Sequence, residues 1–162
     1  MGYYTPLSAG DIIFLEGFKD GIEKCENFSP NLLFASVLKH EKYICKDKSS
    51  LNLPASTHSF ATGHSAACFI KISSHKNFGL YDLSFQLAAD NDFFEKIRLN
   101  SESSILYSQT TLGYFPPAGI SRDDDLKSVV EIFRSRVKNK NSIILELALL
   151  AKRLYKFRKS IY

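Results

Sequence analysis

Tryptophan is absent from this sequence, and cysteine is scarce, with only Cys25, Cys45 and Cys68. The cysteine count is odd and no two cysteines stand in a C-x-x-C pair, which argues against a disulfide framework or a zinc site and favours a reduced interior. No apolar run approaches the roughly 18 residues that a membrane-spanning helix needs. The opening Tyr3-Tyr4-Thr5-Pro6 lacks the basic start and apolar core of a signal peptide. We therefore expect a cytoplasmic protein.

What remains is the composition of an ordinary globular domain. A chain of 162 residues with 44% hydrophobic and 23% charged residues is long enough to bury a core as one unit. The net charge of +4 is spread unevenly, because five basic residues and no acidic residue lie between Lys152 and Lys159. No RNA- or DNA-binding motif accompanies this basic tail, so we expect no nucleic-acid partner.

The hydrophobic pattern alternates between strand-like and helix-like segments. It predicts strands at 10–15, 34–38, 68–72 and 103–107, and helices at 19–27, 92–99, 126–138 and from 142 into the tail. The lysine-rich segment 39–50 is expected to form a solvated loop or an edge hairpin, and 56–65 to form a loop of the kind that often carries binding groups. This order predicts an α/β fold with a mixed sheet flanked by helices over 1–125, followed by C-terminal helices over 126–162.

Two stretches of the chain resemble a known enzyme family. The first stretch begins at Gly63 and is clearest up to Asp92; it contains GHS, then FIK, then FGLYDLSFQLAADNDFF. The second stretch is GYFPPAGIS at 113–121. In order and spacing they resemble the second half of bacterial family 2 glycosyltransferases, which build cell-surface polysaccharides. The resemblance covers about residues 11–121. It implies a partial GT-A-type fold and a transferase that moves a sugar, with inversion, from a nucleotide-diphosphate sugar to a polysaccharide or lipid-linked acceptor.

The resemblance makes Asp90 the main catalytic candidate. It matches the family acid that acts as general base and takes the proton from the attacking acceptor hydroxyl. From the residues alone, Asp90 is instead an N-cap of the helix that follows it, and the two roles can coexist. Asp92 either caps the same helix or lies in its first turn, and it is a secondary candidate for substrate binding.

Four further residues are substrate-binding candidates through the same resemblance. His64, with Ser65 beside it, aligns with a family loop histidine near the donor phosphates or the acceptor pocket, and an imidazole can donate a hydrogen bond to a phosphate oxygen. Gly119 and Ser121 match a loop that covers the active site, where glycine allows close backbone approach and serine can reach a phosphate. The alternative for His64 is a surface or capping histidine.

Other polar residues are interpreted as structural. Asp82 is expected to fix a turn by accepting hydrogen bonds from nearby backbone N–H groups. His40, His58 and His75 are interpreted as surface or capping histidines.

The family also implies a divalent metal, Mn²⁺ or Mg²⁺, held by hard oxygen ligands that bridge two phosphates. In family members, a strand similar to Gly10–Leu15 ends in an acidic motif that holds the metal. This chain offers Glu16 and Asp20 instead, with Lys19 between them, so these two acids are the metal candidates of a degenerate site. The alternative is that both are plain loop residues.

In the family this strand follows a nucleotide-binding βαβ region, whereas here Gly10 lies only nine residues after Met1. We therefore expect the sequence to correspond to the acceptor half without its nucleotide-binding units. The alternative function is a truncated, inactive remnant, or a half that depends on a partner chain for donor binding. An incomplete sheet also predicts self-association unless a partner covers its edge.

The tail combines basic and apolar residues on one expected helix. Lys152, Lys156 and Lys159 follow the apolar positions Leu145 and Leu149 on neighbouring turns. Such a basic amphipathic helix binds anionic membrane surfaces, which would place the protein at the inner face of the plasma membrane. The alternative is a solvated helix end whose basic residues complement the helix dipole.

Overall fold

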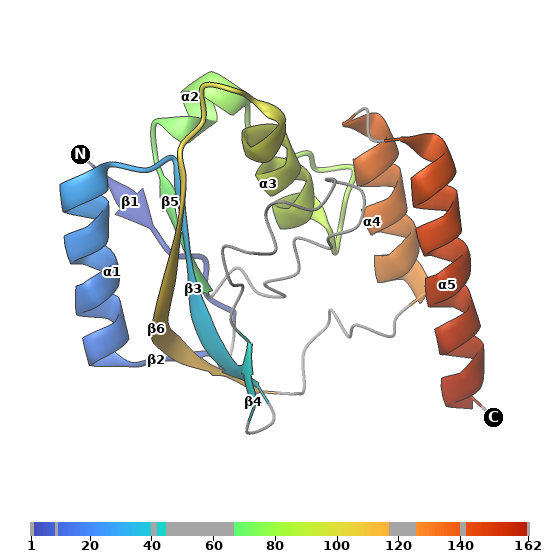
Figure 1. The fold of residues 1–162 in the computed structure, drawn as a ribbon, viewed down its shortest axis with the longest axis horizontal. Helices are drawn as coiled ribbons and strands as arrows, with labels where there is room; N and C mark the ends of the chain where they lie inside the picture. The colour runs from blue at the N-terminus through green and yellow to red at the C-terminus, as the bar shows by residue number, and fades with distance from the viewer. Residues whose placement is uncertain are drawn as a thin grey trace.

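The computed structural model describes residues 2–8, 10–39, 42–44, 67–116, 126–139 and 142–161. These residues form a mixed α/β fold in which one curled sheet carries helices on both sides (Figure 1). The helices are α1 (Leu15–Phe28), α2 (Ser74–Phe78), α3 (Ala89–Leu99), α4 (Leu126–Lys138) and α5 (Ile143–Ile161). In Figure 1, α1 lies on one side of the sheet and α3 on the other, with the α4–α5 pair beyond α3. The expected α/β class is therefore confirmed.

Six strands of the described residues form the sheet, in the order β1-β5-β3-β6-β2 with β4 beside β3. They are β1 (Tyr3–Tyr4), β2 (Ile12–Ile13), β3 (Leu32–Lys39), β4 (Lys42–Ile44), β5 (Cys68–Lys71) and β6 (Ile105–Phe115). The central β3–β6 pair is parallel and the other pairs are antiparallel. β4 pairs with the end of β3, so the start of the lysine-rich segment takes the hairpin form rather than the loop form.

The core has two layers, one on each face of the sheet. The layer under α3 contains Leu32, Phe34, Cys68, Ile70, Phe93, Phe94 and Ile97. The layer under α1 contains Cys25, Leu33, Ala35, Phe69 and Leu112. Successive residues of β3 fall into alternate layers because side chains alternate along a strand. A strand buried on both faces has a continuous apolar run, which is why β3 was recognisable from the sequence.

Two glycines allow α1 to lie directly on the sheet. A Cβ at Gly17 would stand 2.0 Å from the backbone oxygen of Thr111, and one at Gly21 would stand 2.2 Å from the Phe69 ring. Neither distance is possible for a real Cβ, so any larger residue would push the helix away from β6 and β5. The close approach therefore depends on glycine at both positions.

The N-terminal elements differ from the sequence prediction. The expected strand at 10–15 is reduced to β2, and the chain is already helical from Leu15, so α1 is longer at both ends than the predicted 19–27. The change of structure occurs at Phe14, whose N–H donates to Leu112 O at 2.9 Å while its carbonyl accepts from Phe18 N at 2.9 Å. Glu16 and Asp20 consequently lie on a helix, and the interpretation of both as loop residues is wrong.

A buried set of charges joins the last three helices. Arg136 of α4 is only 3% exposed. Its Nη1 lies 3.2 Å from Glu146 Oε2 on α5, and its Nε lies 3.8 Å from Glu95 Oε1 on α3. Glu95 also forms an ion pair with Arg98 on its own helix. Because these charges are withdrawn from water, each depends on its partners, and the arrangement fixes the α4–α5 pair against α3.

Candidate functional site

Asp90 lies in the first turn of α3, and it is not the N-cap. The N-cap residue is Ala88, whose methyl side chain forms no capping hydrogen bond. The Oδ1 atom of Asp90 instead accepts a hydrogen bond from the adjacent Asn91 N–H at 2.7 Å. The N-cap interpretation of Asp90 is therefore wrong, because the helix begins one residue before the acid rather than after it.

The carboxylate of Asp90 stands in an environment that disfavours its charge. Burial raises the pKa of Asp90, although backbone N–H groups offset part of this effect. Its negative charge in turn raises the pKa of both Cys68 and Tyr81, which burial has already raised. Within the described part of the chain, no cation contributes to the pKa of Asp90. The site therefore holds an acid with increased proton affinity and, among the residues that the structure describes, no ion-pair partner.

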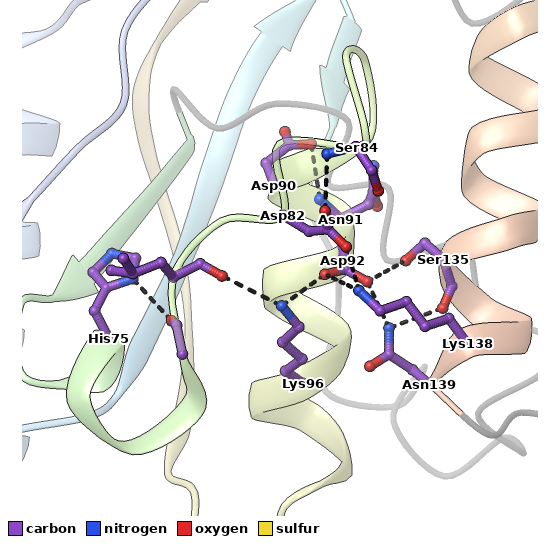
Figure 2. Close-up of polar contacts among 12 residues, drawn as sticks. His75, Asp82, Ser84, Asp90, Asn91, Asp92, Lys96, Ser135, Lys138 and Asn139 are labelled. Atoms are coloured by element: carbon purple, nitrogen blue, oxygen red, sulfur yellow. Dashed lines mark hydrogen bonds and ion pairs between the residues drawn. The ribbon is translucent and has the colours of Figure 1, made fainter.

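Asp92, two residues further along α3, has a different environment. Its side chain is fully buried, and Oδ1 accepts hydrogen bonds from Asn139 Nδ2 at 2.9 Å and Ser135 Oγ at 3.3 Å. Its Oδ2 lies 2.8 Å from Lys96 Nζ, and Figure 2 shows Lys138 approaching from α4. The Asp92 carboxylate is thus occupied by internal contacts that hold α3 against α4.

Asp82 fixes the turn before α3, as predicted. Its Oδ1 accepts a hydrogen bond from Ser84 N at 2.8 Å. Its Oδ2 also forms an ion pair with Lys138, and the hydrogen bonds from Lys138 and Ser84 hold the pKa of Asp82 well below its usual value. Figure 2 shows that Lys138 extends between Asp82 and Asp92. Lys138 therefore joins the turn, α3 and α4.

Glu131 of α4 was not singled out in the sequence, yet it completes the start of α3. Its Oε2 accepts hydrogen bonds from Leu87 N at 2.7 Å and from Ala88 N at 3.1 Å. Burial raises the pKa of Glu131, but the N–H groups of 86–88 outweigh burial and leave the pKa below its usual value. The sequence did contain a signal for this role, because Glu131 stands inside the apolar run from Val129 to Phe133. An acid among apolar neighbours indicates a buried position, where it needs a partner.

His75 lies among aromatic rings rather than at an open surface. Its ring stacks on Phe93 with centroids 4.4 Å apart. The Tyr4 hydroxyl lies 2.6 Å from Nε2, and the hydroxyls of Tyr4 and Tyr81 are 2.9 Å apart. Nδ1 lies 3.2 Å from the Gly79 carbonyl, at the end of α2. Because a carbonyl only accepts, Nδ1 is the donor, so the capping interpretation of His75 is confirmed while the surface interpretation is wrong.

The two metal candidates lie on α1 and have their own partners. Glu16 is exposed and lies 3.3 Å from Lys19 Nζ. Asp20 forms an ion pair with Lys24 and accepts a hydrogen bond from Ser108 Oγ at 3.1 Å. Burial raises the pKa of Asp20, but these hydrogen bonds leave it below its usual value. Across the described ranges, no group of three or more His, Cys, Asp or Glu residues is arranged to hold a metal ion.

The remaining candidates His64, Ser65, Gly119 and Ser121 lie outside the described residues, as do His40 and His58. Of the predicted site residues, the described structure brings together Asp90 and Asp92 on α3, and it places Glu16 and Asp20 on α1. The two groups lie on opposite sides of the sheet (Figure 1). Among the described helices, none has both the length and the apolar character to cross a bilayer.

Comparison of the chain with protein-family models, with curated proteins and with solved structures finds no match.

Proposed function

We propose that the chain is a sugar-transfer protein of the family 2 glycosyltransferase type, with a partial GT-A-type fold and Asp90 as its general base. The proposal rests on the sequence segments around Asp90 and on the chemistry of that side chain. An acceptor hydroxyl attacks the anomeric carbon of a nucleotide-diphosphate sugar and passes its proton to the carboxylate, and the diphosphate leaves with the electrons of the broken bond. Glu16 and Asp20, the expected ligands of Mn²⁺ or Mg²⁺, lie on α1 across the sheet from Asp90 (Figure 1), so they do not fit a metal that acts beside this base.

One observation carries the proposal: Asp90 has a raised pKa and no ion-pair partner among the described residues. A general base works best when its proton affinity lies close to the operating pH, and perturbed carboxylates gather at functional sites. The neighbouring Asp92 forms an ion pair with Lys96 and accepts a hydrogen bond from Asn139. Of these two acids, Asp90 is therefore the one free to exchange a proton with a substrate.

The surrounding contacts would position this base. Glu131 holds the backbone before α3, and Asp92 fixes the first turn of the helix to α4. A catalytic group held on a helix by packing keeps its geometry better than one on an unsupported loop. Asp92 and Glu131 would thus act as positioning residues for Asp90.

Donor binding is tested by a thermal melt with and without a uridine-diphosphate sugar and Mn²⁺. Ligand at about 100 times its dissociation constant stabilises a fold by about 2.7 kcal/mol. Where the donor binds, Asp90→Asn should reduce sugar transfer by about 10²–10⁴-fold, the usual contribution of a general base. Glu102→Gln, an exposed acid beyond the end of α3, is the matched control and should retain activity. Equal activity of Asp90→Asn and Glu102→Gln would rule out the general-base assignment.

A second candidate is an acceptor-binding half that functions with a partner chain or as an inactive remnant. The observation in its favour is an exposed apolar surface at one end of the sheet, where Ile12 is 53% and Leu15 is 65% exposed. We expect Leu15→Lys to reduce concentration-dependent association in sedimentation velocity. A wild-type chain that stays monomeric at high concentration would contradict an association surface there.

The helix α5 supports a membrane-surface role for either candidate. It lies alongside α4, on the side away from the sheet (Figure 1), and Ile144 is 76% and Tyr155 60% exposed. Lys152 and Arg158 are exposed on the same helix. The whole chain should sediment with anionic phosphatidylglycerol vesicles and not with neutral phosphatidylcholine vesicles. Removal of residues 152–162 should abolish sedimentation with the phosphatidylglycerol vesicles. Undiminished binding of the shortened chain would contradict this role.

A further inference from the structure

A cavity of about 390 Å³ opens between α1 and the edge of the sheet formed by β1 and β5. Its walls come from Tyr3, Tyr4 and Thr5 at the sheet edge, from Phe69 of β5, and from one side of α1, which contributes Phe18, Ile22, Cys25 and Glu26. Phe69, Phe18 and Cys25 belong to the core layer under α1. Asp90, by contrast, lies on α3, which covers the other face (Figure 1). The cavity is therefore separate from the proposed sugar-transfer site.

The size of the cavity sets the size of its ligand. A cavity of about 150 Å³ lined by apolar side chains accommodates benzene. The present volume of about 390 Å³ is large enough for two fused six-membered rings, and it falls in the lower part of the range of small-molecule sites.

The wall chemistry favours aromatic ligands. Three of the eight lining residues, Tyr3, Phe18 and Phe69, have aromatic rings on this face of the sheet, and the Phe18 and Phe69 rings lie at 35° with centroids 5.5 Å apart. Such rings favour offset or edge contacts with a further aromatic ring. Gly21 is what allows this arrangement, because any side chain there would displace the Phe69 ring.

The hydroxyl groups of the lining residues are not available to a ligand. The Tyr3 hydroxyl already donates to Pro30 O at 2.9 Å, and the Tyr4 hydroxyl already contacts His75. Thr5 Oγ1 is buried and has no hydrogen-bond partner among the described residues. Because the Thr5 hydroxyl is buried, it is closed to a ligand in the cavity.

Charge in the wall excludes anions. Burial raises the pKa of the Cys25 thiol to about 11, so this side chain stays uncharged at neutral pH. Glu26 is exposed and is the lining residue that carries a negative charge. A carboxylate or sulfonate ligand would be repelled by Glu26 and poorly solvated by the aromatic wall.

We propose that this cavity binds a small, neutral aromatic molecule, which packs against the Phe18 and Phe69 rings. The probe is 2-naphthol, which has two fused aromatic rings and one hydroxyl. Binding to the full chain is measured by saturation-transfer NMR and by the change in naphthol fluorescence. Wild-type protein should bind 2-naphthol at least ten-fold more tightly than 2-naphthoate, and more tightly than 1-octanol.

Matched variants locate the binding. Ile22 lies in the wall and is 39% exposed, so Ile22→Trp can fill the cavity from its rim without disturbing the core. It should weaken binding at least ten-fold. Ile144→Trp makes the same change on α5, away from the cavity, and should leave binding unchanged. Glu26→Gln removes the negative charge from the wall and should reduce the preference for 2-naphthol over 2-naphthoate at least three-fold.

The outcomes separate the proposal from its alternatives. No binding of 2-naphthol by a wild-type chain that melts cooperatively would overturn the proposal, and so would equal binding by wild type and Ile22→Trp. Tighter binding of 1-octanol would overturn the aromatic ligand class. If Ile22→Trp does not fold, Glu26→Gln decides: an unchanged preference for 2-naphthol over 2-naphthoate in that variant contradicts a ligand bound beside Glu26.

Discussion

Glu131 and Ala88 are 43 positions apart in the sequence, and the Glu131 carboxylate accepts a hydrogen bond from the Ala88 N–H at 3.1 Å. A helix usually obtains its N-terminal cap from the residue at its own start, and Ala88 has no side chain that could serve. α3 therefore receives its capping acceptor from another helix. The same contact that completes α3 also fixes α4, so the two helices are expected to lose stability together.

Glu131→Ala should destabilise the fold, because it leaves the N–H groups of Leu87 and Ala88 buried without acceptors. We expect a loss of about 1–3 kcal/mol in the free energy of unfolding, measured by urea denaturation. Glu23→Ala, an exposed acid on α1, is the control and should change stability by less than about 0.5 kcal/mol.

The effect of Glu131 should also depend on pH. The pKa of Glu131 is lower in the folded state than its usual value of 4.5. Its ionised form therefore contributes stability above pH 4.5, and this contribution is lost as the pH falls through the folded pKa. The stability difference between wild type and Glu131→Gln should be full at pH 7 and should shrink below pH 4. A difference that is constant between these pH values would contradict the capping role.

Asp90→Asn and Asp92→Asn should have opposite effects on stability. Burial raises the pKa of Asp90 above its usual 3.8, so the folded state binds the proton more tightly and stability falls as the pH rises between the unfolded and folded pKa values. Asp90→Asn removes this cost and should raise the melting temperature at pH 7 but not at pH 3.5. Asp92→Asn disturbs the pair with Lys96 and should cost about 1–3 kcal/mol. Destabilisation by both substitutions at pH 7 would contradict the assignment.

Arg136→Met should be among the most harmful single substitutions at the α4–α5 pair. It would leave Glu95 and Glu146 buried with reduced compensation, and removal of one partner from a buried ion pair usually costs about 3–5 kcal/mol. Urea denaturation measures the loss. Arg158→Met, at an exposed position on α5, is the control and should change stability by less than about 0.5 kcal/mol. Similar losses from the two substitutions would show that the buried charges do not join the helices.

Tyr4→Phe should cost more than Tyr81→Phe. The Tyr4 hydroxyl contacts both His75 and Tyr81, so its removal leaves two polar groups without their partner, whereas Tyr81→Phe removes one end of the chain of hydrogen bonds. At about 0.5–1.5 kcal/mol for each net hydrogen bond, the difference between the variants should be measurable by chemical denaturation. Equal losses would indicate that the Tyr4 hydroxyl contributes through one contact alone.

The sequence predicted elements whose cause is local or strongly periodic. β3 and β5 follow from short apolar runs, and α4 and α5 follow from apolar residues at helical spacing with a break at Asn139. β6 was predicted only at its start because its middle is polar. Ser36 Oγ donates to Gln109 O at 3.1 Å within this polar stretch, and parallel pairing with β3 extends the strand to Phe115. Its length depends on a partner that is distant in sequence.

The candidate site was only partly predictable, for the same reason. Asp90 was selected because its segment resembles the family motif, but its raised pKa results from the packing of the fold around it. Glu131 lies on another helix, and its role becomes visible only when α4 packs on α3. The start of α1 was missed because Gly17 disfavours a helix in isolation, while the close packing against β6 requires it.

The parallel pairing of β3 and β6 has a consequence for the way the chain reaches this structure. Leu32 lies opposite Ile105, so the centre of the sheet cannot form until a long intervening segment has been brought together. Such non-local pairs slow folding, since the entropy of closing the loop is lost before the contact forms. During synthesis, β3 leaves the ribosome well before its parallel neighbour exists. Until β6 emerges, one edge of a strand as apolar as β3 has no permanent partner, and a chaperone that binds extended apolar segments would find its site there.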